Sequence, residues 1–149
     1  MSRTEKTVFM NMCMVCDNDK VVVMEREKQD WPGVTFPGGH VEYGEPFADS
    51  VIREIQEETG LTIKSPELRG ITDWCDNGCR YVVFLYRATS FSGELKSSDE
   101  GEVRWEELRN LSNLKLTSGM EDYLRVYSEN DLSELYYRKV DSGWANELK

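Results

Sequence analysis

The sequence predicts a single domain of the α+β class, organised around a mixed β-sheet. Its 149 residues fit one domain, and a chain of this length buries about two-thirds of the surface that its unfolded form exposes. Runs of β-branched and aromatic residues recur along residues 1–149, and two segments of helical periodicity interrupt them. Because we find no internal repeat, linker or low-complexity tract, we expect the chain to share one core.

The first elements are predicted to form a β-hairpin. Residues 8–16 and 21–24 are rich in apolar and β-branched side chains, and the polar turn 17–19 separates them. A polar loop that contains Pro and Gly follows over residues 25–33, and residues 34–36 are expected to be extended.

The first helix is expected over residues 46–59. Pro46 suits the first helical position, and Gly60 suits the left-handed residue that ends a helix. Apolar side chains recur there at the spacing i, i+3, i+4 and i+7, so this face should pack on the sheet. They are Ala48, Val51, Ile52 and Ile55.

The rest of the chain is predicted to alternate strands with one more helix. Residues 61–63, 68–74 and 103–105 have extended character, and residues 81–91 form the strongest predicted strand. A second helix is expected over residues 120–127. Strand pairing is therefore expected to be mixed and mostly non-local.

The charge balance restricts the class of partner. The chain has 18 Lys and Arg against 28 Asp and Glu, a net charge of −10. We therefore expect neither duplex nucleic acid nor a membrane as a partner, and a polyanionic ligand would need metal cations or a local basic site. No apolar run is long enough to span a bilayer, and residues 1–10 lack the order of a secretory signal, so we expect a cytoplasmic protein.

The cysteines are predicted to be structural thiols. Cys13 and Cys16 lie in a predicted buried strand, where an odd separation places side chains on opposite faces. Cys75 and Cys79 flank residues 76–78, a hairpin-turn sequence. A zinc site is the alternative interpretation of these spacings.

Three glutamates crowd the first predicted helix. Glu54, Glu57 and Glu58 stand at i, i+3 and i+4, where like charges repel one another. A divalent cation would offset this repulsion, and Mg²⁺ prefers carboxylate and water oxygens. Arg53 could orient one carboxylate through charge-assisted hydrogen bonds. The alternative is a solvated acidic face.

The segment that precedes this helix favours the metal interpretation. The sequence FPGG, residues 36–39, supplies backbone that can approach a ligand or metal closely, because glycine has no side chain. Glu42 and Glu45 add two more carboxylates near the helix start.

The spacing of these residues resembles a complete Nudix box. Gly39, five residues, Glu45, seven residues and the segment REIQEETGL at 53–61 fill every fixed position of the motif. The chain is also similar to the MutT branch through residue 105, and more loosely beyond it. The resemblance implies an α/β/α sandwich in which the box, residues 39–61, forms a loop-helix-loop. It also implies metal-dependent hydrolysis of a nucleoside diphosphate linked to another group.

The resemblance assigns residues to the metal and to catalysis. Mg²⁺, or Mn²⁺ in its place, would be held by carboxylates and one backbone carbonyl. Glu54 or Glu100 would take the proton of the attacking water, and Arg53 would support the cluster. The implied metal ligands are Gly38, Glu54, Glu57, Glu58 and Glu100.

Contacts with the substrate are implied outside the carboxylate cluster. Arg26 matches a family arginine that contacts phosphate, with a solvent-facing arginine as the alternative. The backbone of Gly38 and Gly39 would approach the substrate. Thr117, Ser118, Glu121 or Asp122 would replace the asparagine that reads the purine in MutT relatives, while His40 would lie at the rim.

Family signatures narrow the substrate. Residues 68–79 lack the proline of many ADP-ribose hydrolases, no tyrosine is clearly placed as in dinucleoside polyphosphate hydrolases, and the coenzyme A signature is absent. A nucleoside triphosphate pyrophosphohydrolase therefore leads, with 8-oxo-dGTP as the natural candidate. Two alternative functions stay open: hydrolysis of another nucleoside diphosphate derivative or of an RNA 5′ end, and non-catalytic sensing of a nucleotide. The sequence also leaves open whether the chain forms a homodimer.

Overall fold

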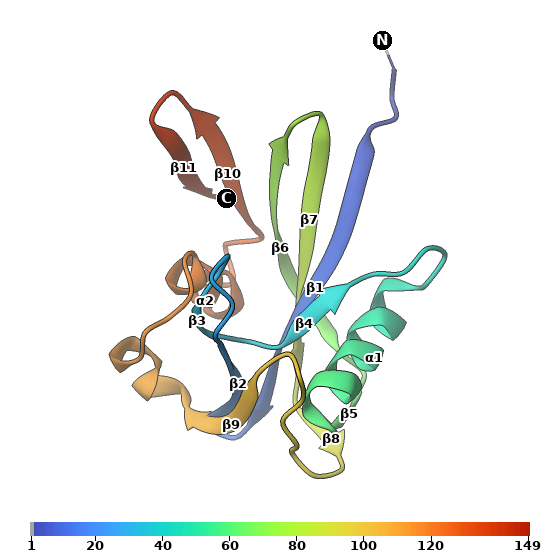
Figure 1. The fold of residues 1–149 in the computed structure, drawn as a ribbon, viewed down its shortest axis with the longest axis vertical. Helices are drawn as coiled ribbons and strands as arrows, with labels where there is room; N and C mark the ends of the chain where they lie inside the picture. Colours follow the sequence, from blue (N-terminus) through green and yellow to red (C-terminus); the bar gives the residue numbers. More distant parts are fainter. Residues whose placement is uncertain (1) are drawn as a thin grey trace.

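The computed structural model describes residues 2–149 and shows an α+β fold around a mixed sheet, as the sequence predicts (Figure 1). Several segments separated along the chain meet in this sheet. The elements follow in this order: β1 Lys6–Asp17, β2 Lys20–Arg26, β3 Gly33–Thr35, β4 Gly38–His40, α1 Phe47–Thr59, β5 Thr62–Lys64, β6 Glu67–Asp76, β7 Cys79–Ala88, β8 Ser90–Ser92, β9 Glu102–Glu107, the 3₁₀ helix η1 Leu108–Asn113, α2 Met120–Ser128, β10 Glu134–Val140 and β11 Gly143–Leu148.

Two parallel strand pairs make the sheet mixed. β1 runs parallel to β7, and β10 runs parallel to β6. Within the described residues the strand order is β11-β10-β6-β7-β1-β2-β3, with β4 paired to β1 and β9 to β2. Residues 6–15 of β1 pair with β7, whereas residues 16–17 pair with β2. This long strand therefore joins the two halves of the sheet.

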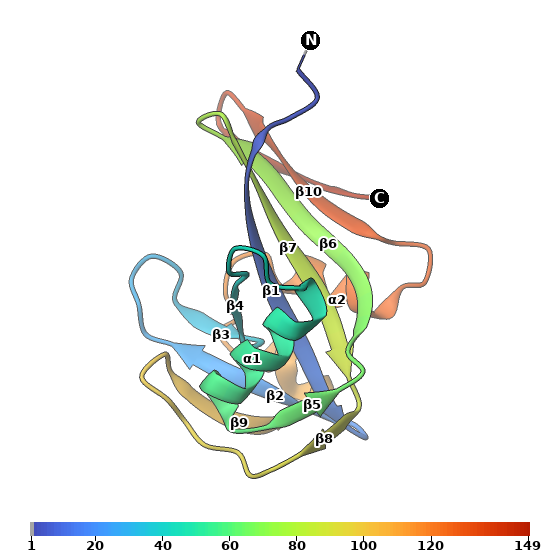
Figure 2. The ribbon, with the colours of Figure 1, turned by 90° about the vertical axis from the view of Figure 1, so that its right-hand side faces the viewer.

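Helices cover both faces of the sheet. Figure 1 shows α1 on one side of β1, β6 and β7 and α2 on the other, and Figure 2 views the α1 side. Alternation along β1 divides the core accordingly: Cys13 packs in the cluster with α1, and Cys16 packs in the cluster with α2. The predicted opposite orientation of these thiols is confirmed, and all four cysteines of the chain are free.

The first helix begins one residue later than predicted. Pro46 has φ −59° and ψ 142°, which places it before the helix as an extended cap residue, and Phe47 is the first helical residue. Gly60 ends the helix with φ 78°, as expected, and its N–H donates to Gln56 O. The prediction that Ala48 is buried is wrong, because Phe47 rather than Ala48 faces the sheet at the start of the helix, where its ring lies 4.3 Å from that of Phe84; Val51 and Ile55 are buried.

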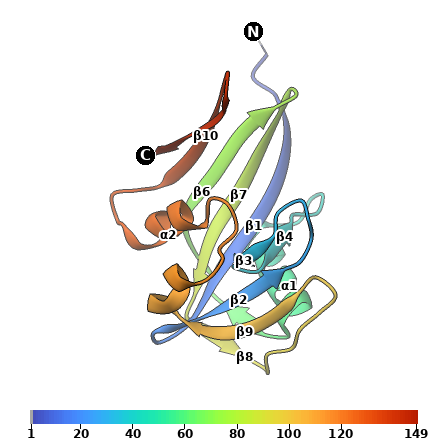
Figure 3. The same cartoon turned by 60° about the vertical axis from the view of Figure 1, so that its left-hand side comes forward.

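Several elements were not predicted from the sequence. They are the short strand β4, the 3₁₀ helix η1 and the C-terminal hairpin β10–β11, which Figure 3 shows above α2. The predicted strand over residues 81–91 is interrupted at Thr89, so that β8 leaves β7 and pairs with β5. Within residues 2–149, no helix has the length and apolar character needed to cross a membrane.

Candidate active site

One large cleft joins the box to the C-terminal hairpin. Its volume is about 1120 Å³, and its lining comes from the strands β1–β4, β6, β7, β10 and β11, from both α-helices and from loops between these elements. At one end the lining is acidic and glycine-rich, with Gly38, Gly39, Glu54, Glu58 and Glu100. Elsewhere it is aromatic, with Trp31, Trp74, Tyr123, Tyr137 and Trp144.

Gly38 and Gly39 lie where side chains would not fit. Both residues pair with β1, opposite Met12 and Asn11. A Cβ on Gly38 would come within 2.1 Å of the Asn11 carbonyl oxygen, and a Cβ on Gly39 would come within 2.3 Å of the Glu54 carboxylate. Because these two glycines have no side chains, β1 can approach Gly38 and the Glu54 carboxylate of α1 can approach Gly39.

A buried asparagine fixes this glycine segment to the helix. The Gly39 N–H donates to Asn11 Oδ1 over 3.1 Å, and Asn11 Nδ2 donates to Ser50 Oγ over 3.0 Å. Both Asn11 and Ser50 are buried. The pair thus links β1, β4 and α1, and it was not identified from the sequence.

Glu58 is a buried carboxylate that faces the glycine segment. It is 7% exposed, and its Oε2 accepts a hydrogen bond from the Gly38 N–H over 2.9 Å. Burial raises the pKa of Glu58 to about 8, because the hydrogen bond from Gly38 only partly offsets the loss of water. Burial also raises the pKa of Glu54, with the hydrogen bond from Arg53 acting in the opposite direction.

Arg53 ties the loop before the helix to the helix itself. Its guanidinium donates to Glu45 over 2.8 and 3.0 Å, to Glu54 over 3.0 Å and to the His40 carbonyl over 3.0 Å. The hydrogen bond from Arg53 is the main reason that the pKa of Glu45 falls to about 2. The arginine also contacts Glu57 over 3.3 Å. It therefore holds three of the box glutamates at once.

The three helix glutamates do not share one environment. Glu54 and Glu58 point toward Gly38 and Gly39, whereas the Glu57 side chain is 56% exposed beside Arg53. Glu58 lies on the buried face of the helix, next along it after Val51 and Ile55. The three glutamates therefore cluster on the helix as their spacing predicts, but only two of them face the glycine segment.

The donor set suits a hard divalent cation. Carboxylate oxygens of Glu54 and Glu58 flank the Gly38–Gly39 backbone, and this all-oxygen chemistry matches Mg²⁺ or Mn²⁺. The burial of Glu58 is also consistent with a cation site, because a bound cation would compensate the negative charge of its carboxylate. In residues 2–149, no three acidic, His or Cys groups already converge as a preformed metal site. Arg53 occupies carboxylate oxygens of both Glu54 and Glu57.

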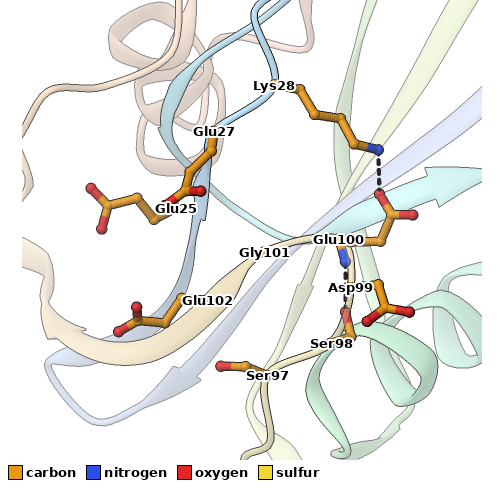
Figure 4. A pocket seen from close by; sticks show the side chains of 9 residues that line it. All are labelled: Glu25, Glu27, Lys28, Ser97, Ser98, Asp99, Glu100, Gly101 and Glu102. Atoms are coloured by element: carbon orange, nitrogen blue, oxygen red, sulfur yellow. Dashed lines mark hydrogen bonds and ion pairs between the residues drawn. The ribbon is translucent and has the colours of Figure 1, made fainter.

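Glu100 reaches the same cleft from a loop. It also borders a second hollow of about 700 Å³ between this loop and the end of β2, shown in Figure 4. Lys28 and Glu100 point toward each other there, with Lys28 Nζ 3.1 Å from Glu100 Oε2. The Glu100 N–H donates to Ser98 Oγ over 3.2 Å. The structure thus brings Glu100 to the box end, as the sequence led us to expect.

Arg26 and Trp31 form one unit on the wall of the cleft. Arg26 Nε donates to the Trp31 carbonyl over 3.0 Å, and its guanidinium lies 5.2 Å from the centroid of the Trp31 ring. Trp31 Nε1 in turn donates to the Ser118 carbonyl over 3.2 Å. Arg26 and Ser118 both line the cleft, whereas Thr117 is 3% exposed and lies behind its lining.

Two of the aromatic side chains on the strands face away from the cleft. Tyr86 and Trp105 pack in the cluster that faces α1. The hairpin instead supplies Tyr137, Trp144 and Asn146 to the cleft. A signal for this hairpin exists in the sequence, because the turn DSG at 141–143 separates ELYYRKV from the alternating segment WANEL.

Comparisons with known proteins agree with this geometry. The NUDIX domain model matches residues 10–127. The Nudix hydrolase YvcI of Bacillus subtilis is 33% identical, covering 72% of this chain and 70% of that protein. An ADP-ribose pyrophosphatase of Methanocaldococcus jannaschii is 32% identical, covering 72% and 68%.

Solved structures give the same result over a larger part of the chain. The MutT protein of Bacillus halodurans superposes with a TM-score of 0.77 at 29% identity, covering 95% of this chain and 97% of that one. A MutT Nudix hydrolase of Burkholderia pseudomallei gives a TM-score of 0.72 at 25% identity, covering 83% and 100%. The chain therefore belongs to the Nudix family of hydrolases, and its structure is of the MutT-like branch.

Proposed function

We propose that this chain hydrolyses nucleoside triphosphates to a nucleoside monophosphate and pyrophosphate, with oxidised purine nucleotides such as 8-oxo-dGTP as the first candidates. The observation that carries the proposal is the continuity of the cleft, which Glu54 and Glu58 line together with Trp31 and Trp74. A nucleotide needs both kinds of surface, because its phosphates are charged and its base is flat and apolar on both faces.

Divalent metal is part of this proposal. Mg²⁺, or Mn²⁺, would be held by Glu54, Glu57, Glu58 and Glu100 with the Gly38 carbonyl. When bound, the metal would neutralise phosphoryl oxygens and help align water for attack. Glu57 would have to leave its contact with Arg53 to take part, and its exposed position permits this rotation.

Side chains of this protein supply the remaining functions. Glu54 or Glu100 would accept the proton of the attacking water. Arg53 would keep Glu54 in place, since it is itself fixed by Glu45. Arg26 would bind a phosphate group, as a guanidinium is suited to phosphoryl oxygens.

The base would occupy the aromatic part of the cleft. Trp31 offers a ring, and the backbone of Ser118 lies beside it. Thr117 is too deeply buried to be a first contact, so we assign it to the support of the Ser118 segment, where its N–H donates to Val34 O over 3.0 Å.

ADP-ribose is the second candidate substrate. The relative from Methanocaldococcus jannaschii is named an ADP-ribose pyrophosphatase, and its identity extends over 72% of this chain. ADP-ribose also joins an aromatic base to a diphosphate, so the same cleft would suit it. The missing proline in residues 68–79 favours the triphosphate instead.

A product assay separates the two candidates. The purified chain is incubated with Mg²⁺ and 8-oxo-dGTP, dGTP, ADP-ribose or a diadenosine polyphosphate, with Glu57→Gln and an EDTA-treated sample as controls. Monophosphate and pyrophosphate, with kcat/KM at least tenfold higher for 8-oxo-dGTP than for dGTP, would support the first candidate. AMP and ribose 5-phosphate would favour ADP-ribose. No product from any of the triphosphates would contradict the proposal.

A further inference from the structure

The C-terminal hairpin lies outside the part of the chain that the family model matches. That match ends at residue 127, whereas β10 and β11 span Glu134–Val140 and Gly143–Leu148. The hairpin extends the sheet by pairing β10 parallel to β6, and Figures 1 and 3 show it beside α2. The cleft therefore has one wall that lies beyond the matched NUDIX domain.

Strand register aligns the side chains of this wall. Asn146 pairs with Tyr137, Tyr137 with Trp74, and Trp74 with Tyr81, so the four share one face of the sheet. This is the α2 face, because Leu135, two residues before Tyr137, packs in the core cluster of that helix. Trp144, two residues before Asn146, continues the row toward the hairpin turn.

The wall is fixed to the start of α2. Tyr137 donates its hydroxyl hydrogen to the Tyr123 hydroxyl over 3.2 Å, and a Cβ on Gly119 would lie 2.1 Å from the Tyr137 oxygen. Gly119 also has φ +91°, which favours glycine. The hairpin is thus held close against the residues that precede the helix, and a rigid wall loses little entropy when a ligand binds.

The outer part of the wall carries side chains suited to a nucleobase. Trp144 is 43% exposed although it is large and aromatic, and Lys139 lies 5.5 Å from its ring centroid. Asn146 Nδ2 donates to Asp122 Oδ2 over 2.8 Å. This bond orients the amide and leaves its carbonyl oxygen and second N–H available. A flat ring beside an adjacent donor and acceptor matches the face and the edge of a base.

We propose that the hairpin is the base-recognition wall of the site. Trp144 stacks on the nucleobase, and Asn146, oriented by Asp122, hydrogen-bonds to its edge. The inference rests on the proposed function for the identity of the ligand. It adds that selectivity among bases depends on residues 144 and 146 rather than on Thr117 and Ser118 alone.

Binding of reaction products tests the wall without requiring turnover. Isothermal titration calorimetry measures dGMP, 8-oxo-dGMP, dAMP and base-free pyrophosphate against the full chain and its variants. Trp144→Ala should raise Kd for each monophosphate about tenfold. Asn146→Ala should change the ratio of affinities for 8-oxo-dGMP and dAMP about threefold or more. Pyrophosphate binding should stay within twofold in both variants.

Tyr136→Ala is the matched control. It removes an aromatic ring from the same hairpin, but Tyr136 lies on the opposite face from Tyr137. It should leave nucleotide affinity unchanged. Equal losses in Tyr136→Ala and Trp144→Ala would overturn the proposal, because they would indicate damage to the hairpin as a whole. Wild-type affinity in both Trp144→Ala and Asn146→Ala would overturn it as well.

The two proposals fail in different ways. A chain that hydrolyses triphosphates while Trp144→Ala and Asn146→Ala bind monophosphates normally would overturn only the wall. A chain that loses monophosphate binding in Trp144→Ala, yet releases no pyrophosphate from any triphosphate, would overturn only the proposed function. Where turnover occurs, Trp144→Ala should raise KM about tenfold and leave kcat within twofold.

Discussion

Glu58 Oε2 accepts a hydrogen bond from the Gly38 N–H over 2.9 Å, which joins the last turn of the box helix to β4, the strand before it. The same carboxylate is buried and carries a raised pKa of about 8. In the metal-free protein its charge is therefore a cost to folding rather than a benefit. The cost is consistent with a residue kept for function.

Glu58→Gln should separate stability from activity. The amide oxygen can still accept the Gly38 hydrogen bond, while the buried charge is removed, so the metal-free variant should be more stable by roughly 1–3 kcal/mol. Turnover should fall at least a hundredfold. Calorimetric unfolding with and without Mg²⁺ checks this, since Mg²⁺ should raise Tm of the wild type more than that of the variant. A less stable variant with normal turnover would contradict the assignment of Glu58.

Glu57→Gln should affect activity alone. The side chain is 56% exposed and its contact with Arg53 is long, so its removal should change the free energy of unfolding by less than about 0.5 kcal/mol. Turnover should nevertheless be abolished if Glu57 binds metal. Urea denaturation and pyrophosphate release measure the two effects, and near-normal turnover would remove Glu57 from the metal site.

Gly39→Ala should displace Glu54 without unfolding the chain. The new Cβ would lie 2.3 to 2.6 Å from the three terminal atoms of the Glu54 side chain, which can rotate away. We expect kcat to fall more than tenfold with little change in Tm, because only the position of the carboxylate is lost.

Gly44→Ala supplies the complementary control. Nothing lies within 4 Å of a Cβ at Gly44, but its φ of +75° strains any other residue by about 1 kcal/mol. This variant should lose some stability and keep its activity. Loss of activity in Gly44→Ala, or full activity in Gly39→Ala, would show that the contact with Glu54 does not control turnover.

The sequence predicts those parts of the site that lie on one helix. The spacing of Arg53, Glu54, Glu57 and Glu58 is local, so a helix over this segment already brings the charges together. Which of these side chains faces inward depends instead on contacts with distant parts of the chain. Glu58 is buried because β4 lies over it, and β4 depends on its pairing with β1.

Residues that enter the site through strand pairing could not be predicted in the same way. Tyr137 and Asn146 reach the cleft because β10 pairs parallel to β6, a contact between distant segments that periodicity does not reveal. Asn11 is an intermediate case. It is a polar residue within the apolar run VFMNMCMVC, and such a residue in a buried strand indicates a hydrogen-bonding role.

Asp73 should make the stability of the protein depend on pH. Burial raises its pKa from the ordinary 3.8 to about 7, and the neighbouring Glu134 adds to this, while Arg80 at 3.0 Å opposes it. Between pH 3.8 and about 7, the Asp73 carboxyl group therefore keeps its proton in the folded state, whereas it has released it in the unfolded state. The free energy of unfolding should therefore fall as pH rises from about 4 to 7, by at most about 1.4 kcal/mol per pH unit from this group.

Asp73→Asn tests this dependence, because the neutral amide has nearly the same shape and cannot titrate. Urea denaturation at intervals from pH 4 to 8 gives the difference in unfolding free energy between the variant and the wild type. That difference should grow in favour of the variant as pH rises, and level off above about pH 7. Glu134→Gln should keep the dependence but shift it to lower pH, since it removes a carboxylate that raises the pKa of Asp73. A difference that stays constant with pH would show that Asp73 is ionised throughout this range.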